Sequence, residues 1–356
     1  MIRIALDAMG SDNAPQVEVE GAAQALKELP AEFQIQLVGR KADIETALAR
    51  VAPPGADRTR IEVVDAPEVV GMGDKPLAAI RGKPRSSIAV GLGLQKKGKS
   101  DAFISAGNTG AVMAASTLLL RLHPGVQRAA IGALFPSAGQ PVLVVDGGAS
   151  IDCDARELVG FAHLGSVYAR DVLGRPNPTV GLLNIGEEDE KGNAVVKEAH
   201  QLLKQTPGIH YIGNVEGRDI PVGEARGQRL DVVACDGFVG NVVLKFYESA
   251  GRVFVSLIKR EAPDVLQRPE MANVLDVLDY ATYGGAPLLG VQGVVIICHG
   301  ASPAKAIKNA IRVAGQAVRS HLSDDIAAEF SEGKVPARSA PSRSCGARAA
   351  MRRRAS

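Results

Sequence analysis

The sequence predicts an α/β fold with a mainly parallel, open sheet and helices on both faces. Six short apolar runs show no polar alternation, as is typical of strands buried on both faces of a parallel sheet. Each run ends in a loop of small and polar residues, and helix-start signals follow at least three of these loops. The chain has 356 residues, of which 46% are hydrophobic and 22% are charged, so it is long enough to bury a large core. We expect one α/β catalytic domain over residues 1–332, a helical subdomain near residues 244–283, and a tail at residues 333–356.

The strands are expected at residues 2–6, 102–104, 142–145, 180–183, 232–234 and 294–297. Because the ligand crevice of such a sheet lies at the carboxyl ends of its strands, we expect one cleft lined by the six loops. Glycine in these loops lets backbone N–H groups approach a ligand, and a helix N-terminus carries about half a positive charge. The expected ligand is therefore an anion, most simply phosphate.

Helix signals follow the strands. Asn13 and Pro15 predict the start of the first helix, as a cap and an N1 proline. Thr109 is expected to cap a second helix at residues 111–121. Two further helices are expected, one after Asn241 and one near residues 303–319.

One motif match is misleading. Residues 93–100 fit the phosphate-loop pattern G-x-x-x-x-G-K-S, which needs a strand before it and a helix after it. Here residues 86–95 resemble a helix that ends at Gly98, and a strand follows from residue 101. The order is reversed, so we do not expect nucleotide binding at this segment.

Several common chemistries lack their motifs. The absence of G-x-S-x-G, H-E-x-x-H and a G-x-G-x-x-G after the first strand disfavours serine catalysis, zinc hydrolysis and ordinary dinucleotide binding. The four cysteines have no C-x-x-C spacing and fit reduced thiols. Aspartates at the strand ends are candidate Mg²⁺ ligands, but we favour bonds within their own turns. We expect no metal and no cofactor.

The chain ends suggest a cytoplasmic protein. The first residues enter a strand without a basic or long apolar leader, and no uncharged apolar stretch approaches the roughly 20 residues of a membrane span.

The net charge of +2 conceals a tail, residues 333–356, with seven basic residues and no acidic one. The rest of the chain has 34 basic and 39 acidic residues. We expect the tail to be disordered and solvated, with no catalytic role and no nucleic-acid partner.

Six segments resemble the bacterial acyl-ACP:phosphate acyltransferase family, and they occur in family order between about residues 2 and 320. These segments are LDAMGSD at 6–12, SAGNTGA at 105–111, LLNIGEE at 182–188, GNVEGRD at 213–219, CDGFVGN at 235–241 and YGGAPLLG at 283–290.

The resemblance implies transfer of a fatty acyl group from acyl carrier protein to inorganic phosphate, which gives acyl phosphate for phospholipid synthesis. It also implies a fold like those of phosphotransacetylases and isocitrate-dehydrogenase-like enzymes, and a homodimer. Peripheral membrane attachment is implied as well, where a glycerol-3-phosphate acyltransferase uses the product. Three alternatives stay open: a short-chain phosphotransacetylase using coenzyme A, a metal- and NAD-dependent dehydrogenase, and a non-enzymatic membrane-associated scaffold.

We expect the turn at residues 105–110 to cradle phosphate, although a tight turn without a ligand is the structural alternative. The candidates for phosphate or substrate binding are Asp7, Ser105, Gly107, Asn108, Thr109, Gly110, Asn184, Asn193, Asp236 and Lys245. For Lys245, a surface lysine is the alternative.

Three residues are candidates for catalysis. Lys191 matches a lysine in the family's loop and would neutralise phosphate; an ion pair within its acidic loop is the alternative. Asn241 would present its amide to the cleft, or else cap a helix. His299 follows a buried strand and would donate to the oxyanion or protonate the departing thiolate. A structural role is the alternative for His299 and is expected for the other histidines.

The chain departs from the family pattern at two positions. Ser11 stands where the family usually has a glycine, and Ser150 replaces an asparagine. The first change puts the geometry of its turn in question, and the second puts Ser150 in doubt as a ligand.

Two surfaces are candidate docking sites. An apolar helical stripe is expected to contact the membrane, with core or dimer packing as the alternative. It comprises Phe246, Tyr247, Ala250, Phe254, Leu257, Ile258, Val274, Leu275, Leu278 and Ala281. A basic set is expected to bind the acidic carrier protein, with solvated charge as the alternative; it comprises Arg81, Lys83, Arg85, Lys96, Lys97 and Lys99.

Overall fold

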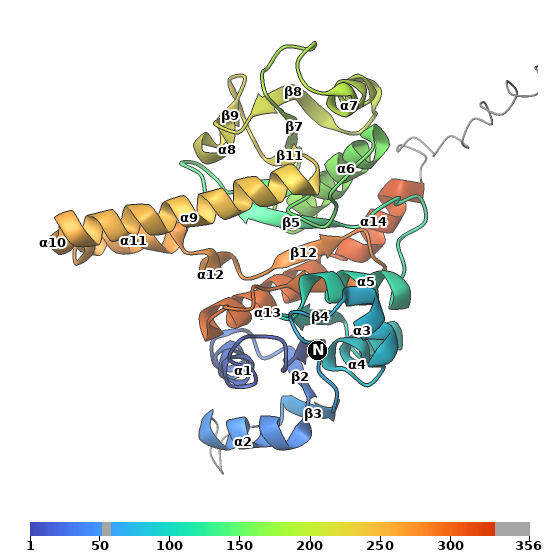
Figure 1. Ribbon diagram of the computed structural model, residues 1–356, viewed down its shortest axis with the longest axis vertical. Coiled ribbons are helices and arrows are strands. Elements are labelled where there is room, and N and C mark those ends of the chain that lie inside the picture. The colour runs from blue at the N-terminus through green and yellow to red at the C-terminus, as the bar shows by residue number, and fades with distance from the viewer. Residues whose placement is uncertain (52–57, 332–356) are drawn as a thin grey trace, which may run out of the picture.

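The computed structural model describes residues 1–51 and 58–331 as one long sheet with helices on both faces (Figure 1). The strands are β1 (Ile2–Asp7), β2 (Phe33–Gly39), β3 (Ile61–Asp65), β4 (Ala102–Ser105), β5 (Ala130–Phe135), β6 (Val142–Val145), β7 (Thr179–Asn184), β8 (His210–Glu216), β9 (Glu224–Ala225), β10 (Gln228–Arg229), β11 (Val232–Ala234), β12 (Ala286–Leu289) and β13 (Val294–Ile297). The helices are α1 (Gln16–Glu28), α2 (Lys41–Val51), α3 (Pro76–Gly82), α4 (Ser87–Lys96), α5 (Thr109–Leu119), α6 (Ala155–Asp171), α7 (Ala194–Gln205), α8 (Asp219–Val222), α9 (Gly237–Glu261), α10 (Pro263–Leu266), α11 (Pro269–Leu278), α12 (Tyr280–Tyr283), α13 (Ala304–Arg319) and α14 (Leu322–Ser331).

The sheet has 11 strands in the order β3-β2-β1-β4-β13-β12-β5-β6-β11-β7-β8. Two parallel blocks, β3 to β13 and β6 to β8, flank β12 and β5. The predicted fold class, a mainly parallel open sheet with helices on both faces, is confirmed. However, β13–β12, β12–β5 and β5–β6 are all antiparallel pairs. Three reversals make the two blocks run in opposite directions. The six strand ends therefore do not lie along one edge of the sheet but form two groups of three, and the single cleft lined by all six loops stays a prediction.

Apolar packing holds the helices against the sheet. The largest buried cluster joins the strands to α1, α6, α13 and α14, and includes Tyr168, Phe161 and Phe33. A second cluster packs α3, α4 and α5 against the other face of the first block. A third packs α8 and the start of α9 against the second block. The continuous apolar runs are buried, as predicted, because every residue of β4, β6, β11 and β13 lies in the interior.

Three helix starts differ from expectation. Pro15 occupies the cap position of α1 and not N1, and no side chain caps that helix. Asn108 and not Thr109 caps α5. The helix expected after Asn241 begins at Gly237, because the Asp236 side chain accepts the Val239 N–H and caps it. In contrast, α13 begins after Pro303 as expected, and α4 ends just before Gly98, with β4 following. That order confirms that residues 93–100 do not form a phosphate loop.

Helix α9 and the shorter α10 and α11 extend away from the sheet as an arm (Figure 1). Residues 244–283 lie mostly in helices, as predicted, while the division of the chain into domains stays a prediction.

Phe246 and Phe254 of α9 are 74% and 63% exposed. Tyr247 does not belong to this exposed stripe, because its ring packs on Phe135 and its hydroxyl donates to the Pro136 carbonyl. Ala281 is also buried, so both assignments to the stripe are wrong. Within the described residues, no helix has the length and apolar character needed to cross a bilayer.

Candidate functional site

The polar strand ends fall into two loop groups. The first loop group follows β1, β4 and β13 and comprises residues 7–12, 105–110 and 298–302. The second loop group follows β6, β11 and β7 and comprises residues 146–150, 235–241 and 184–193. Ala149 of the second group packs against the apolar cluster that contains Ile297, the last residue of β13.

Asp7 organises the first loop group. Its carboxylate is buried and accepts a hydrogen bond from Ser105 Oγ at 2.6 Å and one from the Met9 N–H at 3.0 Å. Ser105 Oγ in turn accepts the Gly107 N–H at 3.0 Å. Burial raises the pKa of Asp7, and the hydroxyls of Ser105 and Ser87 and the Met9 amide oppose that rise. The Ser105 hydroxyl and the Gly107 amide thus already have partners inside the turn.

The three loops of the first group contact one another directly. A Cβ added at Gly10 would lie 2.6 Å from the Gly107 nitrogen, so only glycine allows the first two loops to approach this closely. The Asp12 N–H donates to the Gly300 carbonyl at 2.9 Å and links the first loop to the third. Ser11, the departure from the family pattern, lies between these two contacts.

Asn108 supports the start of α5. Its Oδ1 accepts the Ala111 N–H at 3.0 Å, and its Nδ2 lies 2.9 Å from the Met72 carbonyl oxygen. The Asn108 side chain therefore holds the helix and the preceding loop. In the described part of the chain, the N–H groups of Thr109 and Gly110 have no hydrogen-bonding partner. Such amides at a helix N-terminus are anion-binding groups.

His299 is exposed at the end of β13. Its Nδ1 accepts the Ala301 N–H at 3.2 Å, which leaves Nε2 without a partner among the described residues. The other five histidines contact neighbouring side chains: His163 contacts Glu329, His200 contacts Tyr211, His123 contacts Ser323, His210 contacts Asn177 and His321 contacts Asp324. His299 is thus the histidine placed at a strand-end loop.

Asp146 organises the second loop group. Its fully buried carboxylate accepts N–H groups of Ile131, Gly148, Ala149 and Ser150 at 2.8–3.0 Å. Ser150 Oγ also donates to it, at 2.6 Å. Ser150 therefore closes a turn, in agreement with the doubt about it as a ligand.

Helix α9 starts against that turn. A Cβ on Gly240 would lie 1.9 Å from the Asp146 carbonyl oxygen, so the helix can lie here only with glycine at this position. Asn241 is exposed and lies beside Gly148, where an added Cβ would be 3.3 Å from the Asn241 Cβ. Lys245 is one turn further on and pairs with Glu248 at 3.0 Å. The structure thus places Asn241 at the loop group and gives Lys245 a local partner.

The loop after β7 holds the remaining candidates. Asn184 Nδ2 donates to the Lys191 carbonyl at 3.1 Å, and Asn193 Oδ1 accepts the Val196 N–H as the cap of α7. The expected alternative for Lys191, an ion pair within its acidic loop, does not occur in the described residues. Glu187 lies near Arg218 and Arg226, and Asp189 pairs with His200 and Lys204. Lys191 is left as an exposed cation.

Two buried polar residues near the loops escaped the sequence analysis. Asn214 of β8 is inaccessible to solvent and donates to the Glu188 carbonyl at 2.9 Å, which anchors the Lys191 loop. Glu18 of α1 is equally buried and accepts the Ser11 N–H at 3.0 Å. Glu18 lies four residues before buried Ala22 and therefore on the same face of α1. This spacing was the signal that could have indicated its burial.

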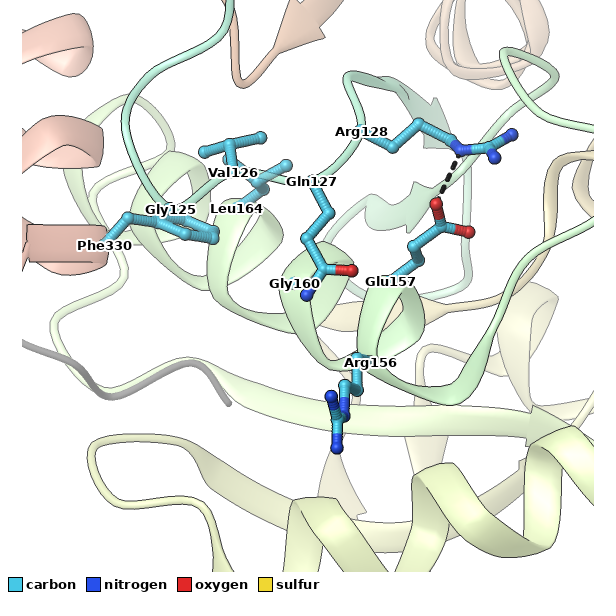
Figure 2. A pocket seen from close by; sticks show the side chains of 9 residues that line it. All are labelled: Gly125, Val126, Gln127, Arg128, Arg156, Glu157, Gly160, Leu164 and Phe330. Atoms are coloured by element: carbon cyan, nitrogen blue, oxygen red, sulfur yellow. Dashed lines mark hydrogen bonds and ion pairs between the residues drawn. The ribbon is translucent and has the colours of Figure 1, made fainter. Parts of the chain in front are cut away.

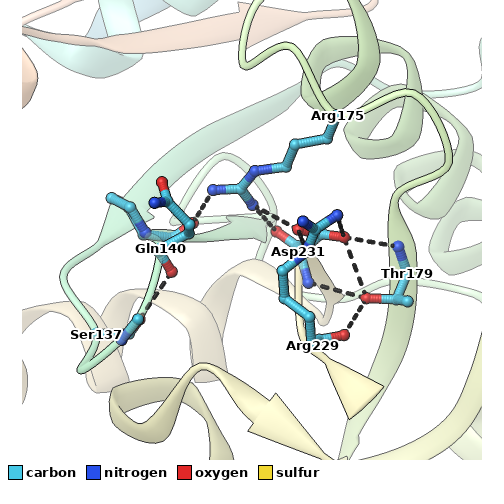
Figure 3. A network of polar contacts seen from close by, with 8 residues as sticks. Ser137, Gln140, Arg175, Thr179, Arg229 and Asp231 are labelled. Atoms are coloured by element: carbon cyan, nitrogen blue, oxygen red, sulfur yellow. Dashed lines mark hydrogen bonds and ion pairs between the residues drawn. The ribbon is translucent and has the colours of Figure 1, made fainter.

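Two other polar features lie apart from the candidate residues. A hollow between α6 and α14, lined by Gly160, Leu164 and Phe330, contains an Arg128–Glu157 ion pair at 2.9 Å (Figure 2). None of the candidate residues lines it. Figure 3 shows the second feature, in which fully buried Asp231 pairs with Arg175 and Arg229 and accepts the Thr179 N–H. That cluster joins the amino ends of β7 and β11, opposite the loops, so we assign it a structural role.

The strand-end aspartates bond mainly within their own turns. Asp7, Asp146, Asp154 and Asp236 each accept backbone N–H groups from nearby residues. In the segments that the structure describes, no three His, Cys, Asp or Glu side chains gather closely enough to hold a metal ion. Cys153, Cys235 and Cys298 are free thiols, and Cys345 lies outside the described residues.

The fold resembles solved enzymes at low identity. A phosphotransacetylase from Streptococcus pyogenes superimposes with a TM-score of 0.61 and 17% identity, covering 89% of this chain and 94% of that one. A 4-hydroxythreonine-4-phosphate dehydrogenase from Klebsiella pneumoniae gives a TM-score of 0.53 and 15% identity, covering 91% of this chain and all of that one. These similarities concern the fold alone.

Sequence comparisons are more specific. The family model described as fatty acid synthesis protein matches residues 2–324. A phosphate acyltransferase of Heliobacterium modesticaldum is 48% identical, over 94% of this chain and 99% of that protein. A phosphate acyltransferase of Nostoc sp. is 44% identical, over 92% of this chain and 96% of that protein. The chain therefore belongs to the phosphate acyltransferase family within the fatty acid synthesis proteins, and it is an acyltransferase.

Proposed function

We propose that this enzyme moves a long-chain fatty acyl group from acyl carrier protein to inorganic phosphate, giving acyl phosphate for phospholipid synthesis. A phosphate oxygen attacks the thioester carbonyl carbon, the carbon–sulfur bond breaks, and the departing thiolate takes up a proton. Phosphate is already anionic at neutral pH, so the site must position it and stabilise the oxyanion more than deprotonate a nucleophile.

The observation that carries this proposal is the start of α5. The Thr109 and Gly110 N–H groups have no partner among the described residues, and they begin an 11-residue helix whose dipole favours an anion. The turn before these amides is held by hydrogen bonds of Asp7, Ser105, Gly107 and Asn108. Ser105 bonds Asp7 and Gly107, and Asn108 bonds the neighbouring loop, so these residues hold the two amides in place. We propose phosphate binding at this helix start.

Three exposed side chains are proposed to act on the reacting groups. Lys191 has no ion-pair partner in the described residues and is available to neutralise phosphate. His299 Nε2 is available to protonate the thiolate. Asn241 is available to donate to the oxyanion. Because Lys191 and Asn241 belong to the second loop group, this proposal requires both loop groups to face one substrate.

The proposal extends to partners and location. We propose a cytoplasmic homodimer that attaches peripherally to the membrane through the α9–α11 arm, where a glycerol-3-phosphate acyltransferase would use the product. The exposed apolar side chains of the arm support this arrangement, and they include Phe238, Val242 and Val253 in addition to Phe246, Phe254 and Leu257. Arg252 and Lys259 lie on the same helix, available for anionic headgroups, together with Arg260, which pairs with Glu261.

Hydroxylamine trapping of acyl phosphate tests the reaction. The protein is incubated with phosphate and EDTA, and either palmitoyl-carrier protein or acetyl-coenzyme A. Product from the long-chain donor alone is expected. Product from acetyl-coenzyme A alone would show a short-chain phosphotransacetylase instead. No product from either donor would contradict the proposed donor and acceptor.

A further inference from the structure

The loop that carries Lys191 is exposed, but its backbone is held by two neighbouring elements. Arg226, between β9 and β10, donates through Nη2 to the Glu187 carbonyl at 2.6 Å. Asn214 of β8 donates through Nδ2 to the next carbonyl, that of Glu188, at 2.9 Å. Two consecutive peptide groups of the loop are therefore fixed shortly before the chain reaches Lys191.

The Glu188 carbonyl links Asn214 directly to Lys191. The same oxygen accepts the Lys191 N–H at 3.2 Å, which closes a turn over residues 188–191. A carbonyl oxygen has two lone pairs, so it can accept both bonds together. The stem of Lys191 also lies against this loop, because a Cβ added at Gly186 would be 3.1 Å from the Lys191 Cγ. The path of the Lys191 side chain thus depends on the turn that Asn214 holds.

The environment of Asn214 shows what its side chain contributes. Asn214 is fully buried in β8, and its Oδ1 has no hydrogen-bonding partner in the described segments of the chain. A buried amide oxygen without a partner costs folding free energy, so an apolar side chain of similar volume would suit this strand position as well. The bond to the Glu188 carbonyl is therefore what distinguishes asparagine from an apolar residue here.

We infer that Asn214 is a positioning residue for acyl transfer: it fixes the Glu188 carbonyl and so holds the turn that presents Lys191 to phosphate. This inference rests on the proposed function, in which Lys191 neutralises phosphate. Lys191 has no ion-pair partner in the described residues, so its backbone and stem determine where the ammonium lies. The attraction between two charges weakens with distance, so a displaced ammonium would bind phosphate less well.

A double-mutant cycle in the full chain tests whether Asn214 acts through Lys191. The forms are wild type, Asn214→Leu, Lys191→Ala and the double variant. Leucine removes the donor and the unpartnered oxygen at similar volume, and the Glu188 carbonyl can keep the Lys191 N–H. For each form, kcat and KM for phosphate are measured with palmitoyl-carrier protein, together with the thermal midpoint.

Thr179→Val is the matched control. The Thr179 hydroxyl is also a buried donor to a backbone carbonyl, that of Arg229, but it lies at the amino end of the neighbouring strand β7, opposite the loops. This substitution should lower the thermal midpoint and leave both kinetic constants unchanged.

Asn214→Leu should raise KM for phosphate about tenfold and change kcat by less than about threefold, because the site still assembles but holds phosphate less well. In the Lys191→Ala background, the same substitution should change kcat/KM by less than about twofold, because the interaction that it weakens is already absent. A residue that served folding alone would lower kcat/KM by the same factor in both backgrounds.

Hydrogen exchange reports on the turn without relying on activity. The Lys191 amide is bonded to the Glu188 carbonyl, so it should exchange faster in Asn214→Leu, where that carbonyl is no longer fixed. Its exchange in Thr179→Val should match that of wild type.

Equal losses of kcat/KM in the two Lys191 backgrounds, or wild-type constants in Asn214→Leu, would overturn the inference. Failure of the proposed function has a different signature, since wild type would then form no acyl phosphate. Hydrogen exchange decides in that case: faster exchange of the Lys191 amide in Asn214→Leu supports positioning by Asn214, and unchanged exchange overturns it. If Asn214→Leu does not fold, the cycle is repeated with Asn214→Ala, which removes the same donor and adds no bulk.

Discussion

At the scale of single residues, most polar side chains of the strand-end loops are bonded to their own framework. Ser105 holds Asp7, Asn108 holds α5 and the preceding loop, and Asp236 caps α9. The groups that we propose to face a substrate are backbone N–H groups and a few exposed side chains, Lys191 and His299 among them. The sequence patterns located the loops that follow the strands but did not reveal which of their side chains bond within the loops.

Replacing Ser105 by Ala tests this supporting role. The change removes a 2.6 Å hydrogen bond from buried Asp7, so we expect a loss of about 1–3 kcal/mol in the free energy of unfolding. The hydroxyl opposes the rise in the pKa of Asp7, so removing it raises that pKa further. A raised carboxyl pKa costs stability as pH rises, and the loss should therefore be larger near pH 8 than near pH 5.

Urea unfolding at the two pH values measures the effect of Ser105→Ala. Ser249→Ala is the control, because that exposed hydroxyl bonds only its own helix, and it should change stability by less than about 0.5 kcal/mol. An equal loss for Ser105→Ala at both pH values would show that Asp7 is not the group affected.

Prediction at residue scale failed where two side chains offered the same chemistry. Asn108 and Thr109 are adjacent and both are good caps, but only Asn108 also reaches the carbonyls of residues 71, 72 and 74. Glu18 was missed for a different reason. Its partner, the Ser11 amide, belongs to a loop whose path the sequence does not reveal.

At the scale of elements, the entry of α9 into the second loop group depends on one close contact. A Cβ at Gly240 would meet the Asp146 carbonyl oxygen at 1.9 Å, and neither group belongs to a flexible side chain. Gly240→Ala should therefore displace α9 or the turn at Asp146, with a loss of stability above about 3 kcal/mol. Circular dichroism on heating and acyl-phosphate formation would measure both consequences.

Gly251→Ala is the matched control on the same helix. Nothing lies within 4 Å of the added Cβ, so the helix propensity of alanine should stabilise α9 by up to about 1 kcal/mol. If the two variants have similar midpoints, the close approach at Gly240 is not the determinant.

The apolar runs predicted where strands lie but not the direction in which they pair. β4, β6, β11 and β13 follow from their residues, since each is a buried run of Val, Ile, Leu or other apolar side chains. β12 contains Pro287 and pairs antiparallel with both neighbours, which no local signal revealed. Pairing direction depends on long-range contacts, and this is why the sequence did not show that the six loops fall into two groups.

At the scale of the whole molecule, the basic residues expected to bind carrier protein divide into two surfaces. Arg81 lies in α3 and Arg85 just before the start of α4, whereas Lys96, Lys97 and Lys99 lie at the other end of α4, about 15 Å from its start for a ten-residue helix. Lys83 is already bonded to Asp74 and to the Val69 carbonyl. Helix α3, which carries Arg81, packs on α5, whose start is the proposed phosphate site.

Charge reversal separates the two surfaces. Arg81→Glu with Arg85→Glu should raise KM for acyl carrier protein about tenfold at low salt and leave KM for phosphate unchanged. Lys96→Glu with Lys97→Glu adds the same charge near the amino end of β4 and should change neither constant. If the lysine pair alone raises KM, the carrier protein docks at the opposite edge of the sheet.

The arm makes the last prediction at this scale. Phe254 and Leu257 are exposed on α9, and burying such side chains in a bilayer interface contributes about 1.5–3 kcal/mol each. Phe254→Asp with Leu257→Asp should abolish flotation with anionic liposomes while the thermal midpoint changes little. Ser249→Asp with Ser256→Asp adds the same two charges to α9 without removing apolar surface, and it should retain more flotation.

Light scattering on the same samples reports the oligomeric state. Loss of a dimer with flotation intact would make this face an interface between two copies, and retention of both properties would show that the arm does not bind the membrane.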